Sequence, residues 1–183
     1  MSILKVARIG TPVLREIADP VPERALGSPE FERLIDDMIE TMHEYDGIGL
    51  AAPQVHASTR IVVIEVPISE ENEEDAEAPL TVLVNPIVTP VGERRVLGWE
   101  GCLSLPEMRG QVIRWDQIHL DAQDRHGNAI DADYSGFFAR VIQHECDHLD
   151  GVLYVDRMEG MRSLCFVPEF DRFVADDEDV PCA

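Results

Sequence analysis

The segment "HECDHLDGVLY", residues 144–154, decides both the fold and the chemistry expected of this chain. His144 and His148 lie four residues apart, so a helix places both imidazoles on one face. Glu145 lies one residue further round the helix, where it can reach a water molecule beside a metal without being a ligand. This spacing predicts a helix that carries a metal site, with Glu145 accepting a proton and later returning it.

The identity of the third ligand is the open question, because a catalytic site of this kind usually takes three protein ligands. In one familiar pattern a histidine stands three residues after a glycine, but here Gly151 is followed at that distance by Tyr154. Three acidic residues downstream could serve: Asp156, Glu159 and Glu169. Upstream, Cys102 in "GWEGCLSLPE" would offer a thiolate, a strong ligand for zinc and ferrous iron. Spacing alone leaves both sources open, since a lone cysteine is more often a small buried hydrophobe.

Two helices are expected from the periodicity of apolar residues. The first covers 31–42, where apolar side chains recur at helical spacing after Ser28, a good N-cap residue. The second covers 136–149 and contains the two histidines. We expect Ser135 to cap its start and Gly151 to end it.

Strands are expected between these helices. The β-branched runs at 60–66 and 80–88 each have strand composition, and residues 118–123 alternate between apolar and polar. The turn sequence "DRHGN" then leads to a short partner strand. Because strands and helices do not alternate regularly, we predict an α+β fold in which mostly antiparallel strands pack around a central helix carrying the H-E-x-x-H motif.

Length and charge restrict the class of protein further. The 183 residues suit a single catalytic domain over 1–183, and the net charge of −21 argues against binding nucleic acid or an anionic membrane. No apolar run approaches the roughly 20 residues of a membrane span, and the start has no secretory signal, so we expect a cytoplasmic protein. An exposed acidic loop is predicted at 69–78 and an acidic, disordered tail from about 174.

Three motifs in order resemble the peptide deformylase family: "GIGLAAPQ" at 47–54, "EGCLS" at 100–104 and "HECDH" at 144–148. The resemblance implies a metal-dependent hydrolase that removes the N-formyl group from the N-terminal methionine of new polypeptides and releases formate. It implies the fold predicted above, and Fe²⁺ as the metal, with Zn²⁺, Ni²⁺ or Co²⁺ able to substitute. It also implies these roles: Cys102, His144 and His148 as metal ligands, Glu145 as general base and acid, and Gln54 and Leu103 as donors to the oxyanion.

The same resemblance suggests residues that bind substrate and residues that support the site. Gly47 and Gly49 would permit close approach and unusual backbone angles, while Ile48 would pair with the extended substrate as an added strand. Gly101 would also contact substrate. Helix geometry, and not the resemblance, suggests that Phe137 and Val141 form an apolar wall. Arg140, where the family often has an apolar residue, would either line the pocket with its stem while its guanidinium reaches solvent at the mouth, or make only a surface ion pair. Glu100 and Arg109 resemble a supporting ion pair near the cysteine.

Two rival functions can be distinguished from this one. The first is a metallopeptidase that uses H-E-x-x-H with a downstream acid, and the second is a catalytically silent, deformylase-like binding protein. The expected partner is the N-formyl-Met nascent polypeptide, with a transient ribosome encounter and no direct contact with nucleic acid or membrane. Docking on the ribosome through the C-terminus is disfavoured, because the end "FDRFVADDEDVPCA" is acidic.

Overall fold

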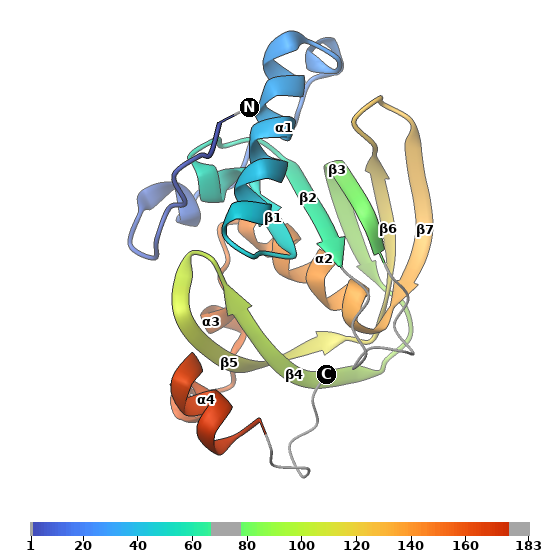
Figure 1. Cartoon of the computed structure of the whole chain (residues 1–183). Coiled ribbons are helices and arrows are strands. Elements are labelled where there is room, and N and C mark those ends of the chain that lie inside the picture. The colour runs from blue at the N-terminus through green and yellow to red at the C-terminus, as the bar shows by residue number, and fades with distance from the viewer. Residues whose placement is uncertain (1, 67–77, 176–183) are drawn as a thin grey trace.

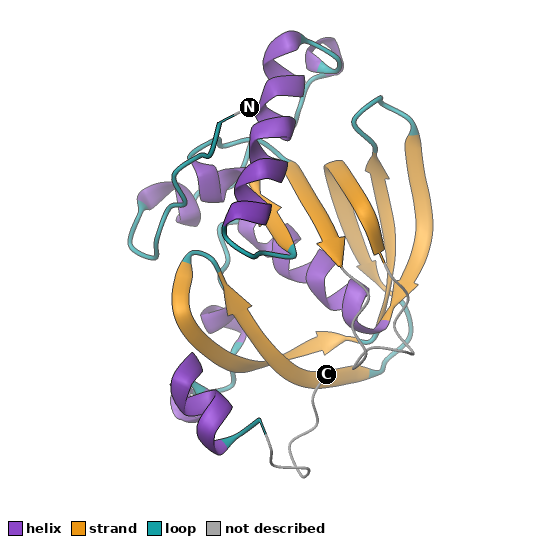
Figure 2. Ribbon diagram, viewed as in Figure 1, coloured by secondary structure: helices purple, strands orange, loops and turns teal. Residues whose placement is uncertain are grey.

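Two antiparallel sheets surround one central helix, α2 (Gly136–Leu149), as Figures 1 and 2 show. The structure is a computed structural model and describes residues 2–66 and 78–175. The predicted α+β architecture, with antiparallel strands around the helix that carries the histidines, is confirmed.

The larger sheet has five strands in the order β1-β2-β3-β6-β7. Their bounds are β1 (Gly49–Ala51), β2 (Ile61–Val66), β3 (Ala78–Pro90), β6 (Gln117–Gln123) and β7 (Ala129–Ser135). The predicted alternation is present in β6, where Ile118 and Leu120 are buried while Asp121 faces solvent. Residues 124–128 form the expected turn, and β7 pairs with β6 along its whole length. This sheet therefore presents one apolar face to α2.

The smaller sheet is a long curved hairpin that the sequence patterns did not reveal. It consists of β4 (Arg95–Cys102), β5 (Leu105–Trp115) and the short β8 (Cys165–Phe166). Glycines at 98, 101 and 110 and a proline at 106 interrupt the strand-like composition of these segments. A register shift between Gly101 and Cys102 ends the regular pairing. Cys102 thus lies at the tip of this hairpin.

Helix α1 (Pro29–Glu44) confirms the first predicted helix and covers one end of the large sheet. Its N-cap is the predicted one, since Ser28 Oγ accepts a hydrogen bond of 3.3 Å from the Phe31 amide. Ile35, Met38 and Met42 are fully buried against β1, β2 and β3 in one apolar cluster. Burial of this stripe fixes the position of β1, which follows α1 directly.

Helix α2 confirms the second predicted helix, with one difference at its start. Ser135 occupies the N-cap position but its side chain makes no capping hydrogen bond. At the other end the helix stops at Asp150, and Gly151 takes a left-handed φ of 72°. Every side chain from Ala139 to Leu149 is buried, so α2 is enclosed by protein on all sides.

Short elements connect and flank this framework. They are η1 (Pro12–Arg15), η2 (Glu23–Ala25), η3 (Ala52–Val55), α3 (Tyr154–Arg157), η5 (Met161–Ser163) and α4 (Val167–Phe173). Within 2–66 and 78–175, no helix is long and apolar enough to cross a membrane. Nearly all of the predicted acidic loop at 69–78, and the predicted tail beyond Ala175, lie outside the described residues.

The left-handed turn after α2 generates a prediction about stability. A Cβ on Gly151 would lie 2.8 Å from the backbone carbonyl of Arg15, in addition to its positive φ. We expect Gly151→Ala to destabilise the fold by more than the roughly 1–2 kcal/mol of a left-handed residue alone. Gly92→Ala is the matched control, because Gly92 has a φ of 74° and open space around it. Urea denaturation of both variants should separate the two costs, and equal losses would show that the close approach is relieved.

Candidate metal centre

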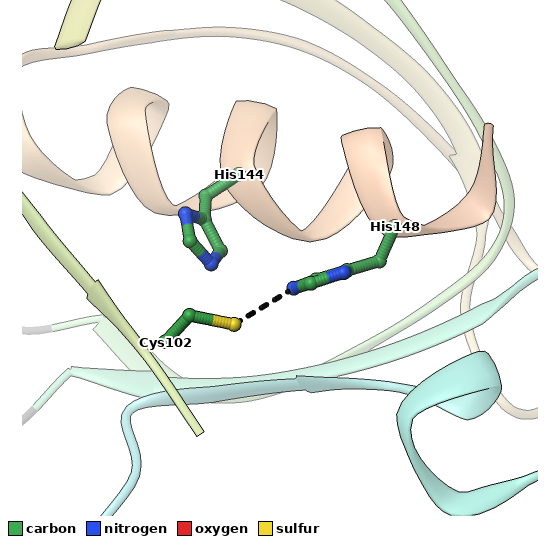
Figure 3. A group of neighbouring side chains, drawn as sticks. All are labelled: Cys102, His144 and His148. Atoms are coloured by element: carbon green, nitrogen blue, oxygen red, sulfur yellow. Dashed lines mark hydrogen bonds between the residues drawn. The ribbon is translucent and has the colours of Figure 1, made fainter. Parts of the chain in front are cut away.

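The structure brings Cys102, His144 and His148 together, although they come from two different elements. Their ligand atoms all lie within 4.8 Å of one another, and Cys102 Sγ is 3.3 Å from His148 Nε2. Figure 3 shows both imidazoles extending from successive turns of α2 toward the cysteine at the end of β4. A thiolate and two imidazoles at this spacing form a ligand set suited to zinc or ferrous iron.

The downstream acids do not join this group. Asp156 pairs with Arg15, and its Oδ2 also accepts a 2.7 Å hydrogen bond from the Leu153 amide. Glu159 and Glu169 are exposed, and neither belongs to a potential metal-holding group within the described residues. The geometry therefore favours Cys102 over any of these carboxylates as the third ligand.

Glu100 fixes the orientation of one histidine. Its Oε2 lies 2.9 Å from His144 Nδ1. Burial alone would raise the pKa of Glu100, but hydrogen bonds from Arg114 and His144 outweigh it and hold the pKa well below its usual range. Because an ionised carboxylate can only accept, Nδ1 must carry the proton. The opposite nitrogen, Nε2, is then the atom that would bind a metal after losing its own proton.

The predicted partner of Glu100 is wrong: Arg114, and not Arg109, makes the ion pair. Arg114 Nε and Nη2 each lie 2.9 Å from a Glu100 carboxylate oxygen. Glu100 stands opposite Gly110 in the hairpin register, so the even-numbered residues of β5 share its face. Arg109 lies on the other face, where its guanidinium is 5.0 Å from the centre of the Phe170 ring.

The expectation that the Arg140 guanidinium reaches solvent is also wrong. Arg140 is 4% exposed, and it donates to Glu100 Oε1 at 2.9 Å and to the Val112 and Val96 carbonyls at 3.0 and 2.7 Å. Burial lowers the pKa of Arg140, although the nearby Glu100 charge opposes this. The reason for the error is geometric. Arg140 lies one turn before His144, and that face of α2 packs against the hairpin.

Glu145 lies beside the ligands with an unused oxygen. The side chain is buried, and its Oε2 has no hydrogen-bond partner among the described residues. Burial raises the pKa of Glu145, against the lowering effect of the two histidines. A buried carboxyl group with a raised pKa is suited to accept a proton and return it.

The two glycines of the first motif act through close approach. A Cβ on Gly49 would lie 2.5 Å from Glu145 Oε1, and one on Gly47 would lie 2.9 Å from Leu103 Cδ1. The predicted unusual backbone angles are absent, since neither glycine has a left-handed φ. The missing side chains make room for the carboxylate and for the loop after Cys102.

Gln54 is held with its amide nitrogen toward the centre. Its Oε1 accepts a 2.8 Å hydrogen bond from the Ala51 amide, while its Nε2 lies 3.3 Å from Ser104 Oγ and 3.6 Å from Cys102 Sγ. Leu103, the residue after Cys102, is half-buried. Both residues flank Cys102, where donors to a developing oxyanion would be needed.

The charge state of the site suits a metal. Burial would raise the pKa of the Cys102 thiol, but the positive charge of His148 and hydrogen bonds from both histidines hold it well below its usual value. Burial raises the pKa of Cys146, which packs in the apolar cluster under the large sheet. Of these two cysteines, Cys102 is the one whose surroundings favour the thiolate. His148 Nδ1 and Glu145 Oε2 are buried polar atoms without partners among the described residues. This chemistry fits a divalent cation.

The remaining predicted residues surround the centre without a tested role. Ile48 immediately precedes β1, an edge strand of the large sheet, and packs with Phe137 and Val141 against one apolar cluster. Gly101 is exposed beside Cys102. The sequence reasoning missed Arg114 and Asp147, whose Nη1 and Oδ2 lie 2.5 Å apart. Asp147 could have been found from its position three residues after His144, on the same helix face.

Comparisons with known proteins agree on one family. The model of the polypeptide deformylase family matches residues 3–163. Peptide deformylase 2 of Pseudomonas putida is 45% identical over 157 residues, which cover 86% of this chain and 88% of the relative. Peptide deformylase 1 of Nitrosomonas europaea is 41% identical over 177 residues, which cover 96% and 99%.

Solved structures give the same result. The class I type b peptide deformylase of Acinetobacter baumannii with bound Met-Ala-Ser has a TM-score of 0.81 and 38% identity, covering 86% of this chain and 100% of that one. The peptide deformylase of Thermotoga maritima has a TM-score of 0.77 and 35% identity, covering 87% and 100%.

The ligand set generates a prediction that concerns metal content alone. Cys102→Ala should lose stoichiometric Zn²⁺ binding, because two imidazoles remain and the thiolate is gone. Cys146→Ala is the control, since it removes a buried thiol from the same helix as the histidines without touching the ligand group. Metal analysis after gel filtration would measure both. Full metal content in Cys102→Ala would mean that a different residue is the third ligand.

Proposed function

The chain belongs to the polypeptide deformylase family, and on that premise we propose how its residues divide the work of deformylation. The reaction itself follows from the family: metal-dependent hydrolysis of the N-formyl group on the N-terminal methionine of newly made polypeptides. The convergence of Cys102, His144 and His148 is the observation that carries the assignment of roles.

Cys102, His144 and His148 would hold the metal. A divalent cation supplies Lewis-acid chemistry, because it polarises a carbonyl group and makes water more acidic. We propose Fe²⁺ as the resident ion, with Zn²⁺, Ni²⁺ or Co²⁺ able to use the same ligands. One thiolate with two imidazoles supports this choice, since these donors suit borderline and soft divalent metals.

Glu145 would move the proton. Its buried carboxyl group takes a proton from the attacking water and delivers it to the amide nitrogen, whose bond to the formyl carbon then breaks. The products are formate and a free α-amine. Support comes from the unpaired Oε2, from the raised pKa and from the contact with Gly49, where any side chain would displace the carboxylate.

Gln54 and Leu103 would stabilise the negative oxygen that develops on the formyl group. The Gln54 amide cannot easily turn, because Ala51 holds its oxygen and Ser104 lies beside its nitrogen. A donor that is already oriented stabilises the transition state without reorganising during the reaction. The backbone N–H of Leu103 would supply the second hydrogen bond from the residue next to Cys102.

The substrate would bind along the edge strand β1. In this arrangement Ile48 pairs with an extended peptide, Gly47, Gly49 and Gly101 allow its backbone to approach, and Phe137 with Val141 contacts the methionine side chain. The edge position of β1 and the packing of Ile48 with Phe137 and Val141 support it.

The setting of the reaction follows from its substrate. Formylated nascent chains are present where polypeptides are made, so we propose a cytoplasmic enzyme with one catalytic domain over 1–183 that meets the ribosome transiently. The metallopeptidase alternative is weaker, because Cys102 completes the ligand group while Asp156 is engaged with Arg15. A silent binding protein would not need Glu145, Gln54 and the ligands together.

Glu145→Gln tests the proton-transfer role. We expect formate release from a formyl-Met peptide to fall by at least about 10²-fold, the scale of general acid–base catalysis. Metal content should stay unchanged, because the side chain is not among the ligands. A variant that lost metal together with activity would show that Glu145 has been given the wrong role.

The choice of metal predicts a difference in air. The Fe²⁺ form should lose activity faster than a Ni²⁺-substituted form, because ferrous iron beside a thiolate is oxidised in air. The sulfur of Cys102 can then be oxidised to a sulfenic or higher acid. Half-lives of both forms in aerated buffer, with and without catalase, would measure this. Equal half-lives would contradict the assignment of iron as the oxygen-sensitive component.

A further inference from the structure

The candidate metal ligands come from two elements that are joined by a group of buried polar contacts. Cys102 belongs to β4, and both histidines belong to α2. His144 and Arg140, one turn apart on α2, both contact Glu100, which lies two residues before Cys102 on β4. A change in these contacts would therefore move one half of the ligand set against the other.

Arg140 makes more of these connections than any other side chain of α2. Its two terminal nitrogens lie within 3.0 Å of Glu100 Oε1, the Val96 carbonyl and the Val112 carbonyl. Val96 is in β4 and Val112 is in β5, so one guanidinium from α2 contacts both long strands of the hairpin. No other buried arginine does this within the described part of the chain.

The charge balance around Glu100 also depends on Arg140. Arg114 divides one positive charge between two buried carboxylates, because it binds Glu100 through Nε and Nη2 and lies 2.5 Å from Asp147 through Nη1. Arg140 supplies a second buried charge to Glu100 alone. Each carboxylate oxygen of Glu100 then has two hydrogen-bond partners: Oε1 has Arg114 and Arg140, and Oε2 has Arg114 and His144. These contacts hold the carboxylate against His144.

We propose that Arg140 is a positioning residue for the metal centre: it fixes the Cys102 strand against α2 and holds Glu100 on His144. The inference rests on the proposed ligand set of Cys102, His144 and His148. The guanidinium suits this task because its planar fork reaches three acceptors in different directions at once. A lysine would keep the charge but offer a single donor centre.

This role differs from ordinary stabilisation of the fold. A buried ion pair contributes little net stability relative to apolar packing, so its presence calls for another explanation. Groups that orient ligands, by contrast, typically change metal affinity or activity by about 10- to 100-fold when they are removed. Metal affinity is therefore the quantity that separates the two interpretations.

The test measures Zn²⁺ affinity by competition with a chelator. The variants are Arg140→Leu, Arg140→Lys and a control, Arg125→Leu. Arg125 also lies between two carboxylates, Glu32 and Asp36, but both belong to α1 and not to α2 or the hairpin. We expect the Kd for Zn²⁺ to rise by about 10- to 100-fold in Arg140→Leu, by less in Arg140→Lys and not at all in Arg125→Leu.

Melting temperatures with and without Zn²⁺ guard against a trivial loss of structure. A purely structural Arg140 would lower both values equally and leave the increase caused by Zn²⁺ as in the wild type. A positioning Arg140 would reduce that increase. Arg140→Lys keeps the buried charge, so the comparison stands even if Arg140→Leu fails to fold.

A double mutant tests the route through Glu100. In a Glu100→Gln background, Arg140→Lys should change the Kd for Zn²⁺ less than it does in the wild type. An undiminished effect would overturn that route, and Arg140 variants that bind Zn²⁺ within twofold of wild type would overturn the proposal. A wild-type protein that bound no Zn²⁺ would instead contradict the ligand set itself, so the two failures are distinguishable.

Discussion

The carboxylate of Glu100 is the junction on which the geometry of the metal centre depends. It lies on β4 two residues before Cys102, and its Oε2 is 2.9 Å from Nδ1 of His144 on α2. The same carboxylate is bound by Arg114 from β5 and by Arg140 from α2. A single buried anion thus joins the three elements that converge on the site. The hydrogen bonds from Arg114 and His144 lower the pKa of Glu100 despite its burial, which favours the charged carboxylate at this junction.

The opposite side of the centre is shaped by missing side chains. Gly49 leaves space for the Glu145 carboxylate and Gly47 leaves space for Leu103, and an alanine at either position would lie within 3 Å of these side chains. Close packing makes such spaces sensitive to a single methyl group. The glycines of the first motif therefore leave space at the centre, while Gln54 at its end has an amide held in a fixed orientation. One side of the centre is set by charge and the other by steric fit.

The sequence predicted what depends on local pattern and missed what depends on strand register. Both helices and the strand at 118–123 follow from periodicity, the strands at 60–66 and 80–88 follow from composition, and two of the three motifs contain the residues that converge at the candidate metal centre. The hairpin β4–β5 was not predicted, because its glycines and Pro106 interrupt the run of strand-forming residues. Without the hairpin there was no register, so nothing showed that Arg114 shares a face with Glu100 while Arg109 does not. The prediction that Arg140 reaches solvent was wrong for the same reason: the hairpin that covers this face of α2 had not been predicted.

Two stripes of buried side chains fix the position of helix α2 against the two sheets. The stripe of Arg140, Gln143, His144 and Asp147 is polar yet buried, and each member bonds to the hairpin, with Gln143 contacting the backbone N–H and carbonyl of Trp115. A second stripe of Ala139, Ile142, Cys146 and Leu149 packs in the apolar cluster of the large sheet. A shift of one residue would turn the helix by about 100° and present apolar side chains to Glu100 and Arg114. The polar stripe would then lie against hydrocarbon without its partners, at a cost of several kcal/mol for each charge. The candidate site is held in place because such a shift of α2 against the two sheets would leave buried charges without partners.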